Sequence, residues 1–173
     1  MATELKTQRL VLREFVTDDV EFILQLLNQR SFLRYIGDKG VRTVDDAKKY
    51  LTAGPIDSYQ HHGFGLYLVE LKDSKVPIGM CGLLKRDLLP YVDLGFAFLP
   101  DFWGKGYAFE AASAVLDQAR DTLRPPRILA ITSPDNDASI TLLKRLGFQF
   151  DRVMKLSNET NEVKLFTLIF ETP

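Results

Sequence analysis

The most constraining feature of this sequence is a strand, a glycine-containing turn and a long helix that follow one another directly. Tyr91–Leu99 is apolar and is closed by Pro100, which is typical of a strand and its end. The helix is predicted over Phe109–Leu123, because apolar residues recur on one face at Ala108, Ala111, Ala112, Val115, Leu116 and Ala119. Most of that stripe is alanine, so this helix can pack unusually close to the element that it covers.

The other elements alternate along the chain without a repeat or a long linker, which favours one domain over residues 1–173. Strands are predicted at Leu5–Phe15, Phe64–Leu71, Pro77–Leu84, Arg127–Thr132, Phe148–Leu156 and Val163–Phe170. Further helices are predicted after the pair Asp18 and Glu21, from Thr43 to the region of Gly54 and Pro55, and over Asn136–Leu146, with residues 30–42 irregular. Strands grouped around two crossover helices indicate a mixed α/β (α+β) sheet.

Charge and composition exclude several classes of protein. Lys and Arg total 22 against 23 Asp and Glu, so the net charge is −1 and no global field would hold the chain on nucleic acid or on a membrane. Apolar runs stay well below the ~18 residues of a membrane span, and the first residues lack the apolar core of a signal peptide. A single cysteine, Cys81, favours a cytoplasmic setting. His61 and His62 have no partners at metal-ligand spacing, so no metal is expected.

The turn between the strand and the helix has the chemistry of a phosphate site. Gly104 and Gly106 let backbone amides approach a ligand, and the helix that follows adds free N–H donors and the positive end of its dipole. Lys105 adds a positive charge. The turn matches neither of two common nucleotide motifs, because Leu99 stands at the first P-loop glycine and Phe109 at the third glycine of a dinucleotide fingerprint.

The segment Trp103-Gly-Lys-Gly-Tyr-Ala resembles the acyl-CoA diphosphate loop of the GNAT superfamily of N-acetyltransferases, Gln/Arg-x-x-Gly-x-Gly/Ala, with Trp103 departing from the first position. Together with Arg9-Leu-Val-Leu-Arg, Glu110-Ala, Ser133-Pro-Asp-Asn-Asp-Ala-Ser-Ile and Lys144-Arg-Leu-Gly-Phe, it resembles the RimJ/RimL-like subgroup, which acetylates ribosomal-protein N-termini. The resemblance covers nearly the whole chain. It implies a centrally splayed mixed sheet of about seven strands, flanked by about four helices.

The resemblance also implies how acetyl-CoA, the co-substrate, would be bound. The backbone of Phe96, Phe98 and Leu99 would pair with the pantetheine arm as an extra strand does. The amides of the diphosphate loop would hold the diphosphate; its residues are Trp103, Gly104, Lys105, Gly106, Tyr107 and Ala108. Asn136 matches a family asparagine that contacts the pantetheine arm, and it is equally a good helix N-cap. Ser139 would lie close to the sulfur.

Catalytic residues are assigned by the same resemblance. In the RimJ/RimL-like subgroup, a serine at the position of Ser139 is thought to protonate the leaving thiolate. Many other members use a tyrosine four residues further on, and this sequence has Leu143 there. Asp93 and Glu14 are two candidates for the base, each equally readable as an ordinary carboxylate.

The implied reaction is a direct transfer of acetyl to a primary amine in a ternary complex. An α-amine of pKa ~7.7–8.0 costs only about 1–1.4 kcal/mol to deprotonate at pH 7, against about 4.6 for lysine, so a weak base is enough. We favour a protein N-terminus as acceptor, with Arg34 and Tyr35 at its entrance. The alternatives are a small amine (a polyamine, an aminoglycoside or an amino-acid derivative) and a non-catalytic acyl-CoA-binding module. The protein is expected to be a monomer or a homodimer.

Overall fold

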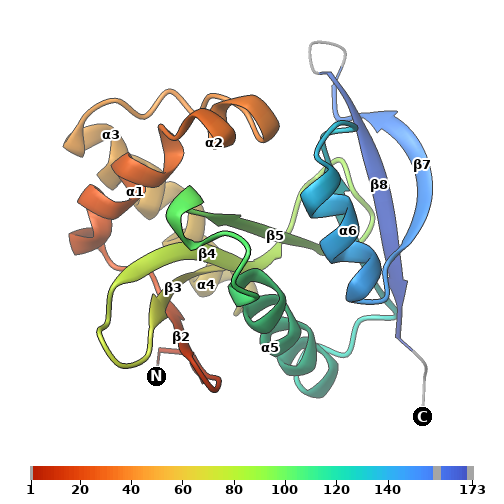
Figure 1. Ribbon diagram of the computed structural model, residues 1–173, viewed down its shortest axis with the longest axis horizontal. Helices are drawn as coiled ribbons and strands as arrows, with labels where there is room; N and C mark the ends of the chain where they lie inside the picture. The colour runs from red at the N-terminus through yellow and green to blue at the C-terminus, as the bar shows by residue number, and fades with distance from the viewer. Residues whose placement is uncertain (1, 158–160, 171–173) are drawn as a thin grey trace.

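The computed structural model describes residues 2–157 and 161–170, which form a single eight-stranded sheet with helices on both faces (Figure 1). The strand order is β1-β2-β3-β4-β5-β6-β8-β7, and every neighbouring pair is antiparallel except β5 and β6. The strands are β1 Glu4–Lys6, β2 Leu10–Glu14, β3 Leu66–Leu71, β4 Pro77–Leu84, β5 Asp93–Phe98, β6 Arg127–Thr132, β7 Gln149–Lys155 and β8 Glu162–Ile169. The predicted mixed α/β class is confirmed.

The helices cover the two faces of the sheet unequally. They are α1 Val20–Leu27, α2 Arg30–Tyr35, α3 Val44–Leu51, α4 Asp57–His62, α5 Tyr107–Asp121 and α6 Asp137–Arg145, with a π-helical turn at Thr52–Ile56 and 3-10 turns at Thr17–Asp19 and Pro100–Phe102. One core cluster joins α1, α2 and α3 to one face of the sheet. A second cluster lies on the opposite face, where α5 and α6 pack, and a small third cluster contains Leu89, Leu129 and Leu165.

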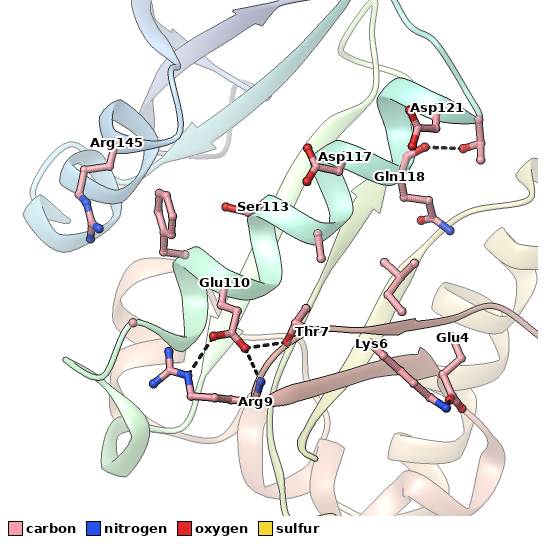
Figure 2. A pocket seen from close by; sticks show the side chains of 15 residues that line it. Glu4, Lys6, Thr7, Arg9, Glu110, Ser113, Asp117, Gln118, Asp121 and Arg145 are labelled. Carbon is pink, nitrogen blue, oxygen red and sulfur yellow. Dashed lines mark hydrogen bonds and ion pairs between the residues drawn. The ribbon is translucent and has the colours of Figure 1, made fainter. Parts of the chain in front are cut away.

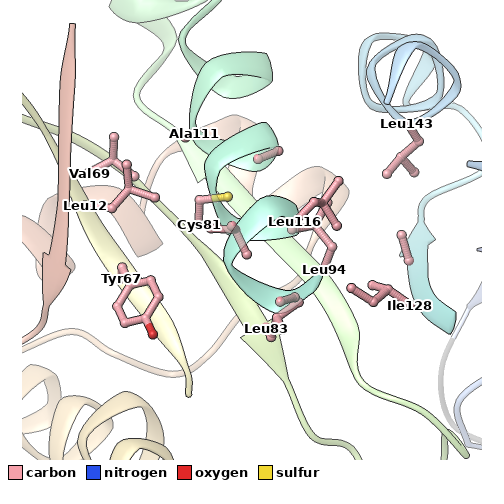
Figure 3. Close-up of a cluster of buried hydrophobic side chains, with 14 of the residues drawn as sticks. Leu12, Tyr67, Val69, Cys81, Leu83, Leu94, Ala111, Leu116, Ile128 and Leu143 are labelled. Atoms are coloured by element: carbon pink, nitrogen blue, oxygen red, sulfur yellow. The ribbon is translucent and has the colours of Figure 1, made fainter. Parts of the chain in front are cut away.

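The alanine stripe lets α5 pack close against the middle of the sheet. Ala111, Ala112 and Ala119 are buried there, and Figure 3 shows Ala111 beside Cys81 of β4. Cys81 is fully buried and free, and burial raises the pKa of its thiol. No helix in the described residues is long and apolar enough to cross a membrane.

Two differences from the sequence prediction change the element count. The predicted strand Leu5–Phe15 is two strands, because the Thr7 amide donates to the Leu10 carbonyl (3.0 Å) and turns the chain between β1 and β2. The sheet therefore has eight strands where about seven were expected. The second difference is α2, which occupies part of a segment predicted to be irregular and anchors only Phe32 in the core.

The cap predicted after Asp18 is also different. Asp19, not Glu21, closes this turn, because its carboxylate accepts the Val16 amide at 2.9 Å. In contrast, the Thr43 cap is confirmed: Thr43 Oγ1 accepts the Asp46 amide at 3.1 Å, and Asp46 accepts the Thr43 amide in return.

The sheet is splayed at its centre, as the family resemblance implied. β4 and β5 pair along their length, from Leu84 and Asp93 to Gly79 and Phe98. The parallel pair β5 and β6 is in register only at Asp93 and Leu129. β6 pairs with β8 along its whole length, from Arg127 to Thr132, on its other edge. Past Asp93 and Leu129 no further residue pair joins β5 to β6 in the described residues, so the two halves of the sheet diverge. We call the diverging part of the β5–β6 pair the splay.

Candidate active site

The loop between β5 and α5 presents a row of backbone amides. Gly104 and Gly106 have φ of +73° and +82°, a left-handed conformation that glycine adopts without strain. The first helical hydrogen bond joins the Glu110 amide to the Gly106 carbonyl (3.1 Å). The described residues provide no backbone acceptor for the amides from Gly104 to Ala108, which therefore remain available to a ligand.

Trp103 differs from its expected role. Its amide donates to the Pro100 carbonyl (3.1 Å), so this N–H is not available to a ligand. Its indole Nε1 donates to the Phe98 carbonyl at 2.9 Å. Trp103 therefore ties the loop back to the end of β5, and the amides that can bind an anion begin at Gly104.

The exposed edge of β5 lies beside this loop. The Leu99 amide donates to a β4 carbonyl at 2.9 Å, and the Val92 carbonyl accepts a β6 amide at 3.0 Å. Because successive residues of a strand direct their backbone groups to opposite edges, Phe96 and Phe98 direct theirs, like Val92, toward β6. At Phe96 and Phe98, β6 no longer pairs with β5. Of the backbone groups of these two residues that face β6, only the Phe98 carbonyl has a partner in the described residues, and it accepts the Trp103 Nε1–H. The remaining groups can pair with an extended ligand.

A groove of about 880 Å³ begins at the loop and runs along the outer side of α5 (Figure 2). Gly106 and Arg9 line one end, and Ser113 and Asp117 of α5 lie further along. Sequence reasoning missed this groove, because it is built from the β1–β2 turn and a helix about 100 residues later in the chain.

Asn136 and Ser139 lie at the start of α6. The side chain of Asn136 accepts the Ser139 amide at 3.2 Å, so its interpretation as the N-cap is confirmed. Within the described residues, the Ser139 hydroxyl has no hydrogen-bond partner, and the residue is only partly buried. Its O–H is therefore available to a bound ligand.

Asp93 is buried at the closed end of the splay. Its side chain is 1% exposed, and both carboxylate oxygens lie 3.1 Å from Arg86 Nε. Burial raises the pKa of Asp93 to about 6, and the Arg86 charge opposes that rise. The carboxylate is ionised at neutral pH and can take up a proton under mildly acidic conditions. Arg86 was not predicted, since nothing in its sequence context distinguishes it from an ordinary loop arginine.

Glu14, the other predicted base, lies away from this region. The strand register aligns Glu14 with Tyr67, Tyr67 with Cys81 and Cys81 with Phe96. Three strand spacings of ~4.8 Å place it about 14 Å from β5. Its carboxylate accepts the Thr3 amide at 3.1 Å. The structure therefore brings Asp93 to the edge of the splay and leaves Glu14 outside it.

Arg34 and Tyr35, predicted at the acceptor entrance, lie on α2. The Arg34 guanidinium is 4.8 Å from the Tyr35 ring and forms an ion pair with Asp135 at 3.3 Å. Asp135 also accepts the Ser133 hydroxyl at 2.5 Å. This contact joins α2 to the loop between β6 and α6, so Arg34 spans the two halves of the sheet.

Residues 2–157 and 161–170 contain no group of three or more His, Cys, Asp or Glu side chains that could hold a metal ion. The groups that the fold assembles are backbone amides, one buried carboxylate and one free hydroxyl, which suit an organic anion and acid–base chemistry.

Comparison with known families decides the assignment. The sequence model of the family described as "Acetyltransferase (GNAT) domain" matches residues 9–149. The chain belongs to the GNAT family. This GNAT protein is therefore an acyltransferase, as the loop and its flanking motifs implied, and the alternative of a non-catalytic module is not supported.

Relatives and solved structures agree with this assignment. The uncharacterized N-acetyltransferase YnaD of Bacillus subtilis is 28% identical over 151 residues, covering 87% of this chain and 85% of YnaD. An acetyltransferase structure from Agrobacterium tumefaciens has a TM-score of 0.81 at 23% identity and covers 96% of this GNAT protein and 94% of that chain. A RimL ribosomal-protein acetyltransferase in complex with coenzyme A has a TM-score of 0.83 at 19% identity, covering 96% and 98%. These two likenesses show a shared fold.

Proposed function

We propose that this GNAT protein transfers acetyl from acetyl-CoA to the N-terminal α-amine of a protein, as a cytoplasmic monomer or homodimer. The observation that carries the coenzyme part of the proposal is the juxtaposition of two sets of unused backbone groups. One set is the amides from Gly104 to Ala108, and the other is the Phe96 backbone and the Phe98 amide on the open edge of β5. One set suits an anion, and the other suits an extended amide chain.

The diphosphate of acetyl-CoA would bind at the loop. Successive amides around two left-handed glycines form an anion-binding concavity, and the N-terminus of α5 adds the positive end of a helix dipole. Lys105 supplies a cation from the same turn. Its ammonium lies 5.6 Å from the Phe102 ring and has no ion-pair partner within the described residues, so it is free to reach a phosphate.

The pantetheine arm would then run along Phe96 and Phe98 of the splay toward Ser139. Leu99, which the family resemblance included, has no free backbone group, because its amide donates to the Ile78 carbonyl and its carbonyl accepts the Phe102 amide at 3.0 Å. Pairing with the open edge of β5 would satisfy both the pantetheine amides and the unpaired backbone groups. This direction brings the thioester between β5, which carries Asp93, and α6, which carries Ser139.

Catalysis would consist of attack by the neutral amine on the thioester carbonyl. The amine nitrogen forms the new C–N bond, the C–S bond breaks, and the amine proton leaves to Asp93 or to water. Ser139 donates its hydroxyl proton to the departing thiolate and is reprotonated from solvent. A pKa of about 6 leaves Asp93 ionised at neutral pH, and a weak base is enough for an α-amine.

The acceptor would enter beside Arg34 and Tyr35. The exposed Arg34–Asp135 ion pair bridges the two halves of the sheet above the splay, where the acceptor must approach the thioester. The ribosomal-protein acetyltransferases that share this fold support a protein N-terminus as acceptor. A small amine remains the alternative.

The experiment is a thiol-release assay with acetyl-CoA and a matched panel of acceptors. The decisive pair is one peptide with a free N-terminus and the same peptide with a blocked N-terminus and one lysine; a polyamine, an aminoglycoside and free amino acids complete the panel. We expect release only with the free N-terminus. Activity confined to a small amine would overturn the proposed acceptor, and absence of coenzyme binding would overturn the proposal as a whole.

A further inference from the structure

Two motifs that are far apart in the sequence meet beneath the diphosphate loop, and this inference about them rests on the proposed coenzyme site. Arg9 precedes β2, and Glu110 lies in the first turns of α5. We propose that Arg9, anchored by Glu110, is a positioning residue that fixes the Lys105–Gly106 peptide and directs the Gly106 amide toward the diphosphate of acetyl-CoA.

The Glu110 carboxylate is the anchor of this arrangement (Figure 2). Its Oε1 atom pairs with Arg9 Nε at 2.9 Å, and its Oε2 atom accepts the Arg9 amide at 3.0 Å and the Thr7 hydroxyl at 2.6 Å. Glu110 is only 18% exposed. Three donors converge on this largely buried carboxylate, and they hold both the backbone and the side chain of Arg9 in place.

The anchored guanidinium reaches the loop through its other nitrogens. Arg9 Nη1 donates to the Lys105 carbonyl at 2.9 Å, and Nη2 lies 3.3 Å from the position that a Gly106 Cβ would occupy. Arg9 Cζ also lies 4.5 Å from the centre of the Tyr107 ring. The guanidinium therefore contacts Lys105 and Tyr107 and fills the space beside Gly106.

The contact with the carbonyl determines where the next amide points. The peptide bond is planar and trans, so the Lys105 carbonyl and the Gly106 N–H point in opposite directions. Because Arg9 holds the carbonyl on its own side, the Gly106 amide is directed to the other side of the loop. Gly104 and Gly106 adopt left-handed conformations, and glycine has unusual backbone freedom. Without the Arg9 contact, the Lys105–Gly106 peptide could therefore rotate.

Charge gives a second reason for the pairing. Glu110 places a negative charge close to the helix N-terminus, where it would repel a bound diphosphate. The Arg9 guanidinium neutralises that charge. A purely electrostatic role and a positioning role therefore make opposite predictions for removal of the Glu110 charge.

Arg13, on β2 and four residues after Arg9, offers a matched control. Arg13 pairs with Asp19 through Nη2 at 2.9 Å and Nη1 at 3.0 Å, and its Nε lies 3.4 Å from Glu70. Within residues 2–157 and 161–170, Arg13 forms no hydrogen bond or ion pair with the diphosphate loop. Each arginine therefore uses several nitrogens of its guanidinium to bridge two partners. Arg13→Lys therefore reports the general cost of replacing such a fork by a lysine.

The experiment compares Arg9→Lys, Glu110→Gln and Arg13→Lys with the wild-type protein. The dissociation constant of coenzyme A is measured by titration calorimetry, KM and kcat are measured with acetyl-CoA, and the melting temperature is measured without ligand. Lysine keeps the charge of Arg9 but cannot bridge Glu110 and the Lys105 carbonyl. We expect Arg9→Lys to weaken coenzyme binding about 10- to 100-fold, the range for a charged hydrogen bond, with kcat at saturation much less affected.

Glu110→Gln separates the two roles by the sign of its effect. Positioning predicts weaker coenzyme binding, because Arg9 loses its ionic anchor, whereas electrostatics alone predicts tighter binding. Arg13→Lys should leave the dissociation constant of coenzyme A unchanged. Wild-type affinity in Arg9→Lys, or tighter binding in Glu110→Gln, would overturn the inference while leaving the proposed function intact. If Arg9→Lys does not fold, the sign for Glu110→Gln still decides, and failure of the wild-type protein to bind coenzyme A would refute the proposed function itself.

Discussion

Replacing Asp93 by asparagine should reduce the loss of unfolding free energy as the pH rises from acidic to neutral. Asp93 is 1% exposed, and burial raises its pKa from 3.8 to about 6 despite the neighbouring Arg86. The folded protein therefore binds a proton at this site more readily than the unfolded chain does. Stability from this group is fully present below pH 3.8 and is lost as the pH rises through 6.

The magnitude follows from the two pKa values. Between pH 4.5 and pH 7.5, linkage predicts that the wild-type protein loses about 2 kcal/mol of unfolding free energy through this one group. Asparagine does not titrate, so Asp93→Asn should not show this loss. The lost contact with Arg86 shifts the stability of the variant equally at both pH values and cancels in the comparison.

Urea denaturation followed by circular dichroism at both pH values measures the difference. The variant should gain about 2 kcal/mol relative to wild type between pH 4.5 and pH 7.5. Asp46→Asn is the control, because hydrogen bonds from the Arg42 amide and from Thr43 lower the pKa of Asp46 to below this window. A constant difference for Asp93→Asn would show that Arg86 stabilises the carboxylate as much as burial destabilises it, and a difference of opposite sign would show that Arg86 stabilises it more.

Four further outcomes test the site. Gly106→Val should abolish the rise in melting temperature with acetyl-CoA, since φ of +82° strains a β-branched residue by about 1–3 kcal/mol and the side chain would lie against Arg9; an unchanged rise would place the diphosphate elsewhere. Asn136→Ala removes the α6 cap and should cost about 1 kcal/mol, a fall of roughly 2–4 °C in melting temperature. Ser139→Ala should lower kcat about tenfold, because a thiol of pKa ~8.5 needs little help to leave; wild-type kcat would exclude it as the acid. Arg34→Ala should raise KM for the acceptor and leave the affinity for coenzyme A unchanged, and the reverse pattern would remove Arg34 from the acceptor entrance.

The sequence was sufficient where periodicity and turn chemistry act locally. The alanine stripe predicted α5 to within two residues at each end, and Arg127–Thr132 is the predicted strand. Local signals failed where an element is too short to show a period. α2 has six residues and a single buried side chain, Phe32, so no recurring face was visible. The turn at Thr7 was missed because residues 7–9 contain no glycine, proline, asparagine or aspartate to mark a turn, and β1 has only three residues.

The diphosphate loop of the candidate site could be predicted from the sequence, but the contacts between distant elements that complete the site could not. Gly104 and Gly106 could be assigned from the sequence, since their spacing before a helix has a direct physical meaning. The ion pairs of Arg9 with Glu110 and of Arg86 with Asp93 depend on contacts between elements that only the folded chain brings together. The exclusion of Glu14 likewise needed the strand register.

The divergence of β5 and β6 has a consequence for how this protein resists aggregation. A backbone edge of this kind normally lies at the border of a sheet, where it can recruit another chain. Here the edge at Phe96 and Phe98 lies inside the sheet, between two halves that a single β5–β6 residue pair joins. A narrow molecule can reach those hydrogen-bonding groups. A strand of another protein carries side chains, which would contact β6 and α6 before its backbone reached the edge. The protein can therefore keep unpaired strand groups without exposing them to other chains.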